Sequence, residues 1–277
     1  MSTETRSTHL LQATARWAAA VRAGERERPD RLVDDPWAAD LAGPDGMAWL
    51  AGRPQGSVLP IVVRTRYFDD WLRAVAIERP MRQVVLLGAG LDTRAWRLPW
   101  PAGATVFEVD HPEVLEAKTE TIARAGAEPA CDRRAVPADL ASDWGVALRD
   151  AGFDPAVPAA WLAEGVLFYL PDGVIHRALE SVSSLAAPGS RLGFDIVNSA
   201  VLTSPYTKAW IDMQAAAGAP WIGAMDDPVA TLADLGWSAS LVQPGEPAAN
   251  HGRWTLPVPP ASMPDLPHSW YVTAELA

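Results

Sequence analysis

The sequence is poor in cysteine and in basic side chains, and each shortage excludes a class of protein. Cys131 is the single cysteine among 277 residues, so an intramolecular disulfide and a zinc site with several cysteines cannot form. Lysine and arginine number 23 against 34 aspartates and glutamates, which gives a net charge of −11. Phosphate backbones and anionic lipids repel such a charge, so we expect neither nucleic acid nor a membrane as a partner.

Long apolar runs are also absent from the sequence. None reaches the length that spans a bilayer. Residues 1–21 contain Arg6, His9 and Arg16 and lack the apolar core and cleavage site of a secretory signal. We therefore expect a cytoplasmic protein. No repeat or low-complexity tract divides the chain, whose length suits one compact α/β domain.

The chain is organised around residues 83–94, with the sequence QVVLLGAGLDTR. An apolar run that leads into Gly-x-Gly is typical of a strand buried on both faces of a parallel sheet. Gly88 and Gly90 lack a Cβ, so the backbone can turn sharply and a ligand can lie against it. A plain glycine turn between strand and helix explains the same pattern, so this motif alone does not establish a ligand site.

A second predicted strand, residues 104–110, ends on Asp110. Nucleotide-binding folds place a carboxylate at about this separation from the glycine turn, where it accepts hydrogen bonds from ribose hydroxyls. Thr93 stands where the dinucleotide pattern has its third glycine, which favours a cofactor without a pyrophosphate. S-adenosyl-L-methionine is such a cofactor.

The rest of the pattern alternates strands with helices, which predicts a doubly wound, mostly parallel, seven-stranded sheet of Rossmann-like type. Asp34 and Asp35 before Pro36 predict a helix start, while Gly24 and Pro80 predict helix ends. The other helices are predicted at residues 10–23, 58–78, 112–125, 171–186 and 228–235, and the strands at 83–87, 104–110, 134–136, 159–163, 191–197, 237–242 and 269–273.

Two regions fall outside this alternation. Residues 1–80 are helical and exceed what a sheet needs for coverage, so we interpret them as a lid over the cofactor. Residues 81–277 form the core, and an insertion at about 199–227 is expected to enclose the substrate. Aromatic side chains of the insertion can equally pack beneath it. The proline-rich segment 243–267 predicts a surface connection.

Several stretches together resemble the leucine carboxyl methyltransferase family, in particular its bacterial branch of small-molecule enzymes. They are RPDRLVDDP at 28–36, RTRYFD at 64–69, LGAGLDTR at 87–94, FEVDHP at 107–112 and AEGVLFYL at 163–170. The resemblance extends to about residue 198 and fades beyond it. It implies a class I methyltransferase fold, S-adenosyl-L-methionine as the cofactor and transfer of a methyl group to oxygen.

The resemblance also implies cofactor-binding roles for residues near the strand ends. Arg64 matches an arginine that holds the carboxylate of the cofactor's methionine portion through paired hydrogen bonds. Gly88, Ala89 and Gly90 match the loop beneath the methionine and the ribose, and Asp110 matches the acid that bonds both ribose hydroxyls. Without the resemblance, Arg64 reads as a surface arginine of a helix.

Four further positions belong to this comparison. Glu108 is the other acid near Asp110, and strand alternation should point both side chains the same way. Asp139 and Leu140 match the pair beside adenine, although Asp139 also suits a plain helix cap. Glu164 matches an acid close to the cofactor's amino group and sulfonium.

Methyl transfer from a sulfonium releases a neutral thioether, so positioning and exclusion of water supply most of the catalysis. A carboxylate acceptor is already ionised, whereas a phenol or an alcohol needs a base within reach. The five histidines form no triad or metal-binding spacing, so we name neither a catalytic base nor a metal ligand. The candidates on the substrate side come from the insertion: Tyr206, Trp210, Met213 and Trp221.

The sequence therefore predicts an O-methyltransferase that acts on a carboxylate or phenol of a small metabolite, including natural products. Methylation of a protein's C-terminal carboxylate is the nearest alternative. Alternatives of another class are an S-adenosyl-L-methionine-binding protein with a non-methylating or regulatory role and a nicotinamide-dependent oxidoreductase, which Thr93 and Arg64 oppose. The oligomeric state is not specified by the sequence.

Overall fold

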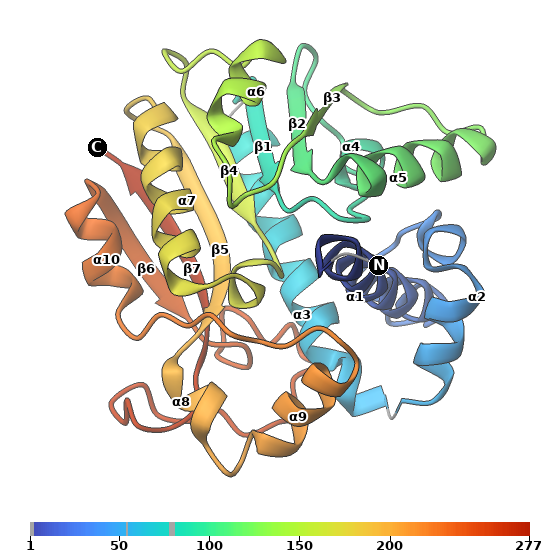
Figure 1. Ribbon diagram of the computed structural model, residues 1–277, viewed down its shortest axis with the longest axis vertical. Helices are drawn as coiled ribbons and strands as arrows, with labels where there is room; N and C mark the ends of the chain where they lie inside the picture. The colour runs from blue at the N-terminus through green and yellow to red at the C-terminus, as the bar shows by residue number, and fades with distance from the viewer. Residues whose placement is uncertain (1–2, 54, 78–80) are drawn as a thin grey trace.

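The computed structural model describes residues 3–53, 55–77 and 81–277, and a seven-stranded sheet runs through it (Figure 1). The strand order is β3-β2-β1-β4-β5-β7-β6; β1 to β5 are parallel, and β7 pairs antiparallel with β5 and β6. This arrangement confirms the predicted doubly wound sheet. The strands are β1 (Gln83–Leu87), β2 (Thr105–Asp110), β3 (Asp132–Pro137), β4 (Ala159–Ala163), β5 (Arg191–Val197), β6 (Trp237–Val242) and β7 (Ser269–Leu276).

One face of the sheet is covered by α6 (Trp144–Asp150), α7 (Asp172–Leu185) and α10 (Pro228–Asp234). Apolar side chains of these helices share a core with Val85 and Leu87 of β1. Figure 1 shows α6 and α7 in front of the strands. The sequence did not predict α6, which is a short helix between β3 and β4.

The opposite face is covered by α1 (Thr3–Arg26), α3 (Gln55–Leu72) and α5 (Pro112–Arg124), which share a second core with Val84 and Leu86. Successive side chains of a strand point to opposite faces, so the unbroken apolar run of β1 supplies both cores. This two-sided burial is the reason why the run is not interrupted by polar residues.

The N-terminal helices differ in detail from the prediction. The prediction that Gly24 ends the first helix is wrong, because α1 continues for two more residues. A Cβ at Gly24 would lie 2.9 Å from Cδ2 of Leu50 on α2 (Ala38–Ala51), so this glycine serves close helix packing. Helix α3, which was predicted to begin at residue 58, begins at residue 55 and continues as the π-helical turn η1 (Arg73–Ile77). Pro80 lies outside the described residues.

The N-terminal segment predicted as a lid also supplies part of the core. Val63, Phe68 and Leu72 of α3 are fully buried in the core that includes strands of the sheet. Arg64, which is next to Val63, lines a cavity instead. One helix therefore both covers the sheet and contributes to the site.

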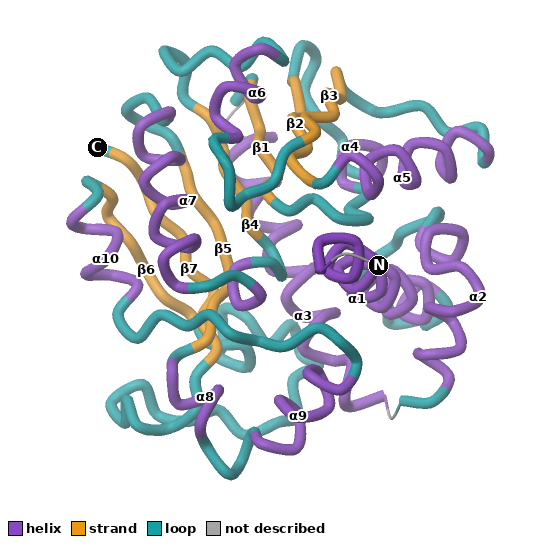
Figure 2. The backbone as a smooth tube through the Cα atoms, in the orientation of Figure 1, coloured by secondary structure: helices purple, strands orange, loops and turns teal. Residues whose placement is uncertain are grey.

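The insertion after β5 contains α8 (Ser199–Thr203) and α9 (Lys208–Ala216) and then an extended return to α10. Figure 2 shows this return and the 243–267 segment as loops. Short helical pieces also follow two of the parallel strands: α4 (Arg94–Arg97) after β1 and η2 (Leu167–Tyr169) after β4. Within the described residues, no helix combines the length and the apolar character that crossing a membrane requires.

Candidate functional site

A cavity opens where the parallel strands β1, β2 and β4 end. Residues that follow these strands form one side of it, and α1, α3, α9 and the segment around Trp221 form the other. All eight residues predicted to bind the cofactor line this cavity: Arg64, Gly88, Ala89, Gly90, Asp110, Asp139, Leu140 and Glu164. Carboxyl ends of neighbouring parallel strands meet at one edge of a sheet, which is why the fold brings these distant positions together.

The turn after β1 depends on its two glycines. Gly88 and Gly90 have φ angles of +62° and +45°, a region that side chains with a Cβ rarely adopt. A Cβ at Gly88 would lie 2.5 Å from Cγ2 of Val166, so the turn also packs tightly beneath the chain after β4. Its backbone is tied to β2, because the Gly88 N–H donates to the Val109 carbonyl at 2.9 Å.

Asp110 locks the same turn from the end of β2. Its carboxylate accepts from the backbone N–H of Gly90 at 2.6 Å and from that of His111 at 2.7 Å. Burial raises the pKa of Asp110, and these two N–H groups offset only part of the effect. A carboxylate has about four acceptor positions, so Asp110 keeps two for hydroxyl groups of a ligand.

Glu108 has a structural role instead. Its side chain is fully buried, forms an ion pair with Lys118 Nζ at 2.9 Å and accepts a hydrogen bond from Arg133 Nε at 2.8 Å. It is not part of the cavity lining. Of the two acids on β2, Asp110 is therefore the one that a ligand can reach.

Arg64 lies between two carboxylates at the ends of β4 and β5. Its Nε is 3.1 Å from Oε1 of Glu164, and its Nη1 is 2.9 Å from Oδ2 of Asp195. Burial opposes the charged form, but Asp195 and Glu164 outweigh it and raise the pKa of Arg64. A Cβ at Gly165 would lie 2.6 Å from Nη2 of Arg64, so the glycine makes room for the guanidinium.

Arg94 joins this cluster and was not identified from the sequence. Its side chain is 2% exposed, and its Nη2 donates to Oε2 of Glu164 at 2.6 Å while Nε donates to Asp69 at 2.7 Å. It also pairs with Asp92. Burial by itself would raise the pKa of Asp92, but Arg94 and other nearby cations lower it to about 2. The signal was its position directly after the glycine turn, in the motif LDTR.

A further ion pair fastens α1 to the turn. The buried Asp35, predicted as a helix cap, accepts from the Trp37 N–H ahead of α2 at 3.2 Å, and also from Nε of Arg22 at 2.8 Å and from the hydroxyl of Thr93 at 2.7 Å. Arg22 also donates to the Leu91 carbonyl at 2.7 Å. Thr93, which departs from the dinucleotide pattern, thus anchors the N-terminal segment to the loop after β1.

Asp139 and Leu140 lie at the cavity wall after β3. Asp139 is exposed and accepts from the Ala141 N–H at 2.8 Å, which stabilises a turn ahead of α6. Leu140 is 8% exposed and packs in the core beneath α6 and α7. Asp139 therefore both stabilises this turn and lines the cavity.

The substrate-side candidates separate into two groups. Trp210 and Trp221 line the cavity, with ring centroids 5.9 Å apart. Tyr206 is 85% exposed and belongs to the turn between α8 and α9, outside the lining, so its substrate-side role stays a prediction that the cavity does not support. Met213 contacts Arg53 and is likewise absent from the lining.

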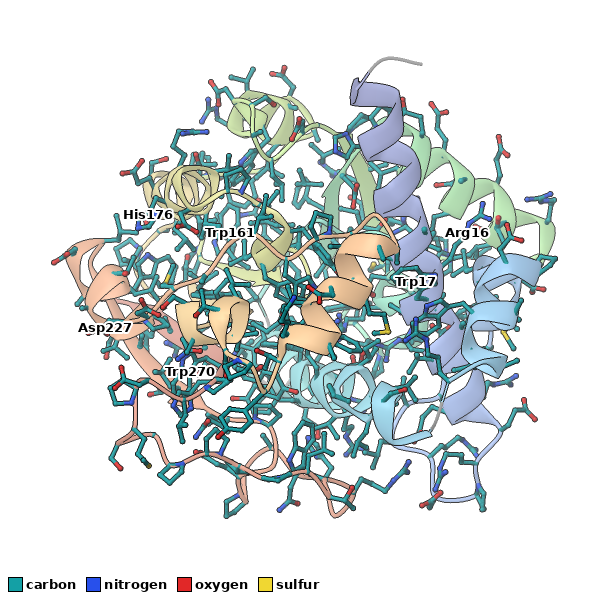
Figure 3. The ribbon with its side chains drawn as sticks, turned by 60° about the horizontal axis from the view of Figure 1, so that its bottom comes forward. Arg16, Trp17, Trp161, His176, Asp227 and Trp270 are labelled. Carbon is teal, nitrogen blue, oxygen red and sulfur yellow. The ribbon has the colours of Figure 1, made fainter. Side chains whose placement is uncertain are left out.

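Sequence reasoning missed the aromatic residues that other elements add to this side. Trp17 of α1, labelled in Figure 3, stacks on Trp49 of α2 with centroids 5.0 Å apart and planes 6° apart. Phe168 lies 4.3 Å from Trp221, centroid to centroid. All of these rings line the cavity, so the side away from the strand ends is an aromatic compartment. Spacing in the sequence carried no signal, because the rings come from segments far apart in the chain.

Neither a histidine pair nor a metal centre is evident in the part of the chain with described side chains. His111 lines the cavity, whereas His176 and His268 bond to backbone or side-chain oxygens elsewhere. No three histidine, cysteine, aspartate or glutamate side chains are grouped to hold a metal ion there.

Residues 15–183 match the family model described as leucine carboxyl methyltransferase. A relative from Mycolicibacterium smegmatis, named as a putative S-adenosyl-L-methionine-dependent methyltransferase, is 40% identical over 95% of this chain and 94% of its own length. One of the same description from Mycolicibacterium paratuberculosis is 41% identical over 91% of this chain and 86% of its own.

Solved structures agree on the fold. A DUF574 family protein from Streptomyces avermitilis superimposes with a TM-score of 0.60 at 17% identity, covering 94% of this chain and 97% of that one. A putative methyltransferase from Thermobifida fusca superimposes with a TM-score of 0.58 at 21% identity, covering 95% of this chain and 94% of that one.

Proposed function

The chain belongs to the leucine carboxyl methyltransferase family of S-adenosyl-L-methionine-dependent methyltransferases, and we propose that it methylates an oxygen atom of a small-molecule metabolite. One observation carries the proposal: the predicted cofactor residues and an aromatic compartment line the same cavity. A cofactor and a compact acceptor can therefore meet there. Family membership leaves the nicotinamide-dependent alternative without support.

The groups around the cavity suit the cofactor chemically. The left-handed turn at Gly88 and Gly90 leaves backbone exposed to a ligand, and Asp110 retains acceptor positions for a ribose diol. Arg64 can pair with a carboxylate, while Glu164 and Asp195 beside it favour a cationic amino group and sulfonium. When bound, the cofactor supplies an electrophilic methyl group.

Asp139 and Leu140 complete the proposed cofactor site. The exposed carboxylate of Asp139 can accept from the exocyclic amine of adenine, and Leu140 can cover the ring. The proposed cofactor residues thus extend along the strand ends from Arg64 to this pair. The acceptor compartment lies on the side of α1, α3 and α9.

The protein's own contribution to the reaction is positioning and exclusion of water. We propose that α1, α2 and the insertion close over the cavity, since Trp17, Trp49, Trp210 and Trp221 form its aromatic wall. Such a wall holds a flat acceptor in a fixed orientation toward the cofactor and keeps water out. Glu164 is committed to Arg64 and Arg94, so it is not available as a base. An acceptor that is ionised or readily ionised fits this arrangement.

Two measurements test the proposed function. Calorimetry with S-adenosylhomocysteine should show stoichiometric binding, and tritium should pass from labelled S-adenosyl-L-methionine to members of a panel of aromatic carboxylic acids and phenols. Mass spectrometry of the product should place the methyl group on oxygen, as an ester or an ether. Methylation of nitrogen or carbon, or cofactor binding without transfer to any oxygen acceptor, would contradict the proposal.

A further inference from the structure

The aromatic compartment contains polar atoms that have no partner within the described part of the chain. Gln214 on α9 is 4% exposed and lines the cavity, and its Oε1 makes no hydrogen bond there. Nε1 of Trp221, a buried donor on the segment that follows α9, lies toward the Tyr169 hydroxyl but makes no hydrogen bond of ordinary geometry. A buried acceptor and a buried donor without partners are costly, and such atoms are often satisfied by a ligand.

These two side chains meet at Tyr169, at the end of η2. Burial raises the pKa of Tyr169, and the nearby side chains of Trp221 and Gln214 offset part of this effect. The rings of Tyr169 and Trp221 are nearly perpendicular, at 87°, with centroids 6.5 Å apart. The three residues therefore form one uncharged polar cluster, which we call the amide–indole–phenol cluster, inside an otherwise aromatic wall.

The charges of the lining restrict what this cluster can bind. Each arginine of the lining already has a carboxylate partner: Arg22 pairs with Asp35, Arg64 with Asp195 and Glu164, Arg94 with Asp69, Asp92 and Glu164, and Arg97 with Asp69. An anionic group held away from the sulfonium would thus be buried without a counter-ion, which is expensive. A neutral hydroxyl can both donate to Gln214 and accept from Trp221 at no such cost.

We propose that Gln214 and Trp221, with Tyr169 beside them, select an aromatic acceptor that carries an uncharged hydroxyl group. The inference rests on the proposed function and adds the substrate class. The ring of the acceptor packs against the tryptophans, its hydroxyl pairs with Oε1 of Gln214 and Nε1 of Trp221, and this fixes the direction in which the acceptor approaches the cofactor.

The test compares matched probes that differ by one ring hydroxyl: 4-hydroxyphenylacetate against phenylacetate, and catechol against phenol. Dissociation constants are measured by calorimetry on the full chain saturated with S-adenosylhomocysteine. The hydroxylated member of at least one pair should bind about 10-fold more tightly, because its absence leaves two buried groups unpaired. In Gln214→Met and in Trp221→Phe this preference should fall to about 1.

Met213→Leu is the matched control, since Met213 precedes Gln214 on α9 but is not part of the lining. It should retain the wild-type preference. Unchanged affinity for S-adenosylhomocysteine in Gln214→Met shows that the variant is folded, so a loss of preference reports on recognition. The proposal is overturned if no pair shows a preference in the wild-type protein, or if Gln214→Met keeps it.

The proposed function is tested by a different measurement, the transfer of tritium to an oxygen acceptor. If S-adenosylhomocysteine binds and the hydroxyl preference is present, but tritium reaches no oxygen acceptor, O-methylation is wrong while the recognition cluster stands. If oxygen is methylated without any dependence on Gln214 or Trp221, the function stands and this inference is wrong.

Discussion

Arg94 and Glu164 bridge the ends of β1 and β4, with 2.6 Å between Nη2 and Oε2. The arginine is 2% exposed at its side chain, and the glutamate is 11% exposed. Glu164 is in turn 3.1 Å from Arg64, so the bridge connects Arg64 to the ion pairs that Arg94 makes with Asp69 and Asp92. The position of Arg64, the proposed cofactor-binding arginine, therefore depends on Arg94 through their shared partner Glu164.

Replacing Arg94 by methionine should strongly destabilise the fold. The change leaves three carboxylates without this cation, those of Asp69, Asp92 and Glu164. Breaking a buried pair on one side costs about 3–5 kcal/mol, and we expect a loss of this size in the free energy of unfolding, measured by urea denaturation. Arg66→Met, which removes the half-exposed pair with Asp70, should cost less than about 1 kcal/mol. Equal losses in both variants would contradict the role of the buried cluster.

Asp92 should stabilise the protein in a pH-dependent manner. Its pKa is lowered from 3.8 to about 2 because the effect of nearby cations exceeds that of burial. A depressed pKa means that the charged form favours the folded state, so the contribution is complete above the unfolded pKa of about 4 and is lost as the pH falls toward 2. Asp92→Asn should therefore lower the free energy of unfolding by about 2 kcal/mol at pH 7.

The measurement is a series of urea titrations of wild type and Asp92→Asn between pH 7 and pH 3. The difference between the two should begin to shrink below about pH 4. Asp212→Asn, in an exposed pair with Lys208, is the control and should show a small difference throughout. If the difference in the free energy of unfolding between wild type and Asp92→Asn stays constant from pH 7 to pH 3, the lowered pKa of Asp92 is contradicted.

Asp110→Asn should weaken binding of S-adenosylhomocysteine by about 10-fold or more, because hydrogen bonds to a charged acceptor are worth about 1.5–3 kcal/mol. Since burial raises the pKa of Asp110, wild-type affinity should also decline as the pH falls toward this raised value, where the carboxylate protonates. Calorimetry over a pH series measures both effects. Asp132→Asn, at the exposed start of β3, should bind as the wild type does. Wild-type affinity in Asp110→Asn would remove this aspartate from the proposed site.

The Gly165→Ala variant, compared with Gly103→Ala, distinguishes the effect of backbone strain from the effect of displacing Arg64. Gly165 has φ +70°, and an added Cβ would lie 2.6 Å from Arg64 Nη2. Gly103→Ala imposes a similar strain, with φ +79°, but meets no atom within 4 Å. Both variants should lose about 1–2 kcal/mol of stability, while only Gly165→Ala should weaken binding of S-adenosylhomocysteine, because it displaces Arg64. Equal affinities in the two variants would show that the guanidinium does not depend on this glycine.

The sequence determined the sheet and the part of the site that belongs to it. Residues 83–94, Asp110 and Glu164 could be placed together because each follows a recognisable buried strand, and parallel strands bring their carboxyl ends to one edge. The glycine turn could also be predicted from the local sequence, because its positive φ angles require glycine. Helix boundaries were less well determined, as Gly24 shows, since a glycine needed for packing looks like one that ends a helix.

Only the tertiary structure decided which side chains line the aromatic compartment. Gln214 and Trp221 come from the insertion, while Trp17 comes from the first helix, and their meeting depends on how α1 and α9 pack over the sheet edge. Tyr206, in the turn just before α9, is exposed to solvent although its place in the insertion suggested a role toward the substrate. The ends of strands can be predicted from the local sequence pattern. Contacts between distant segments depend on tertiary packing, which no single stretch of the sequence specifies.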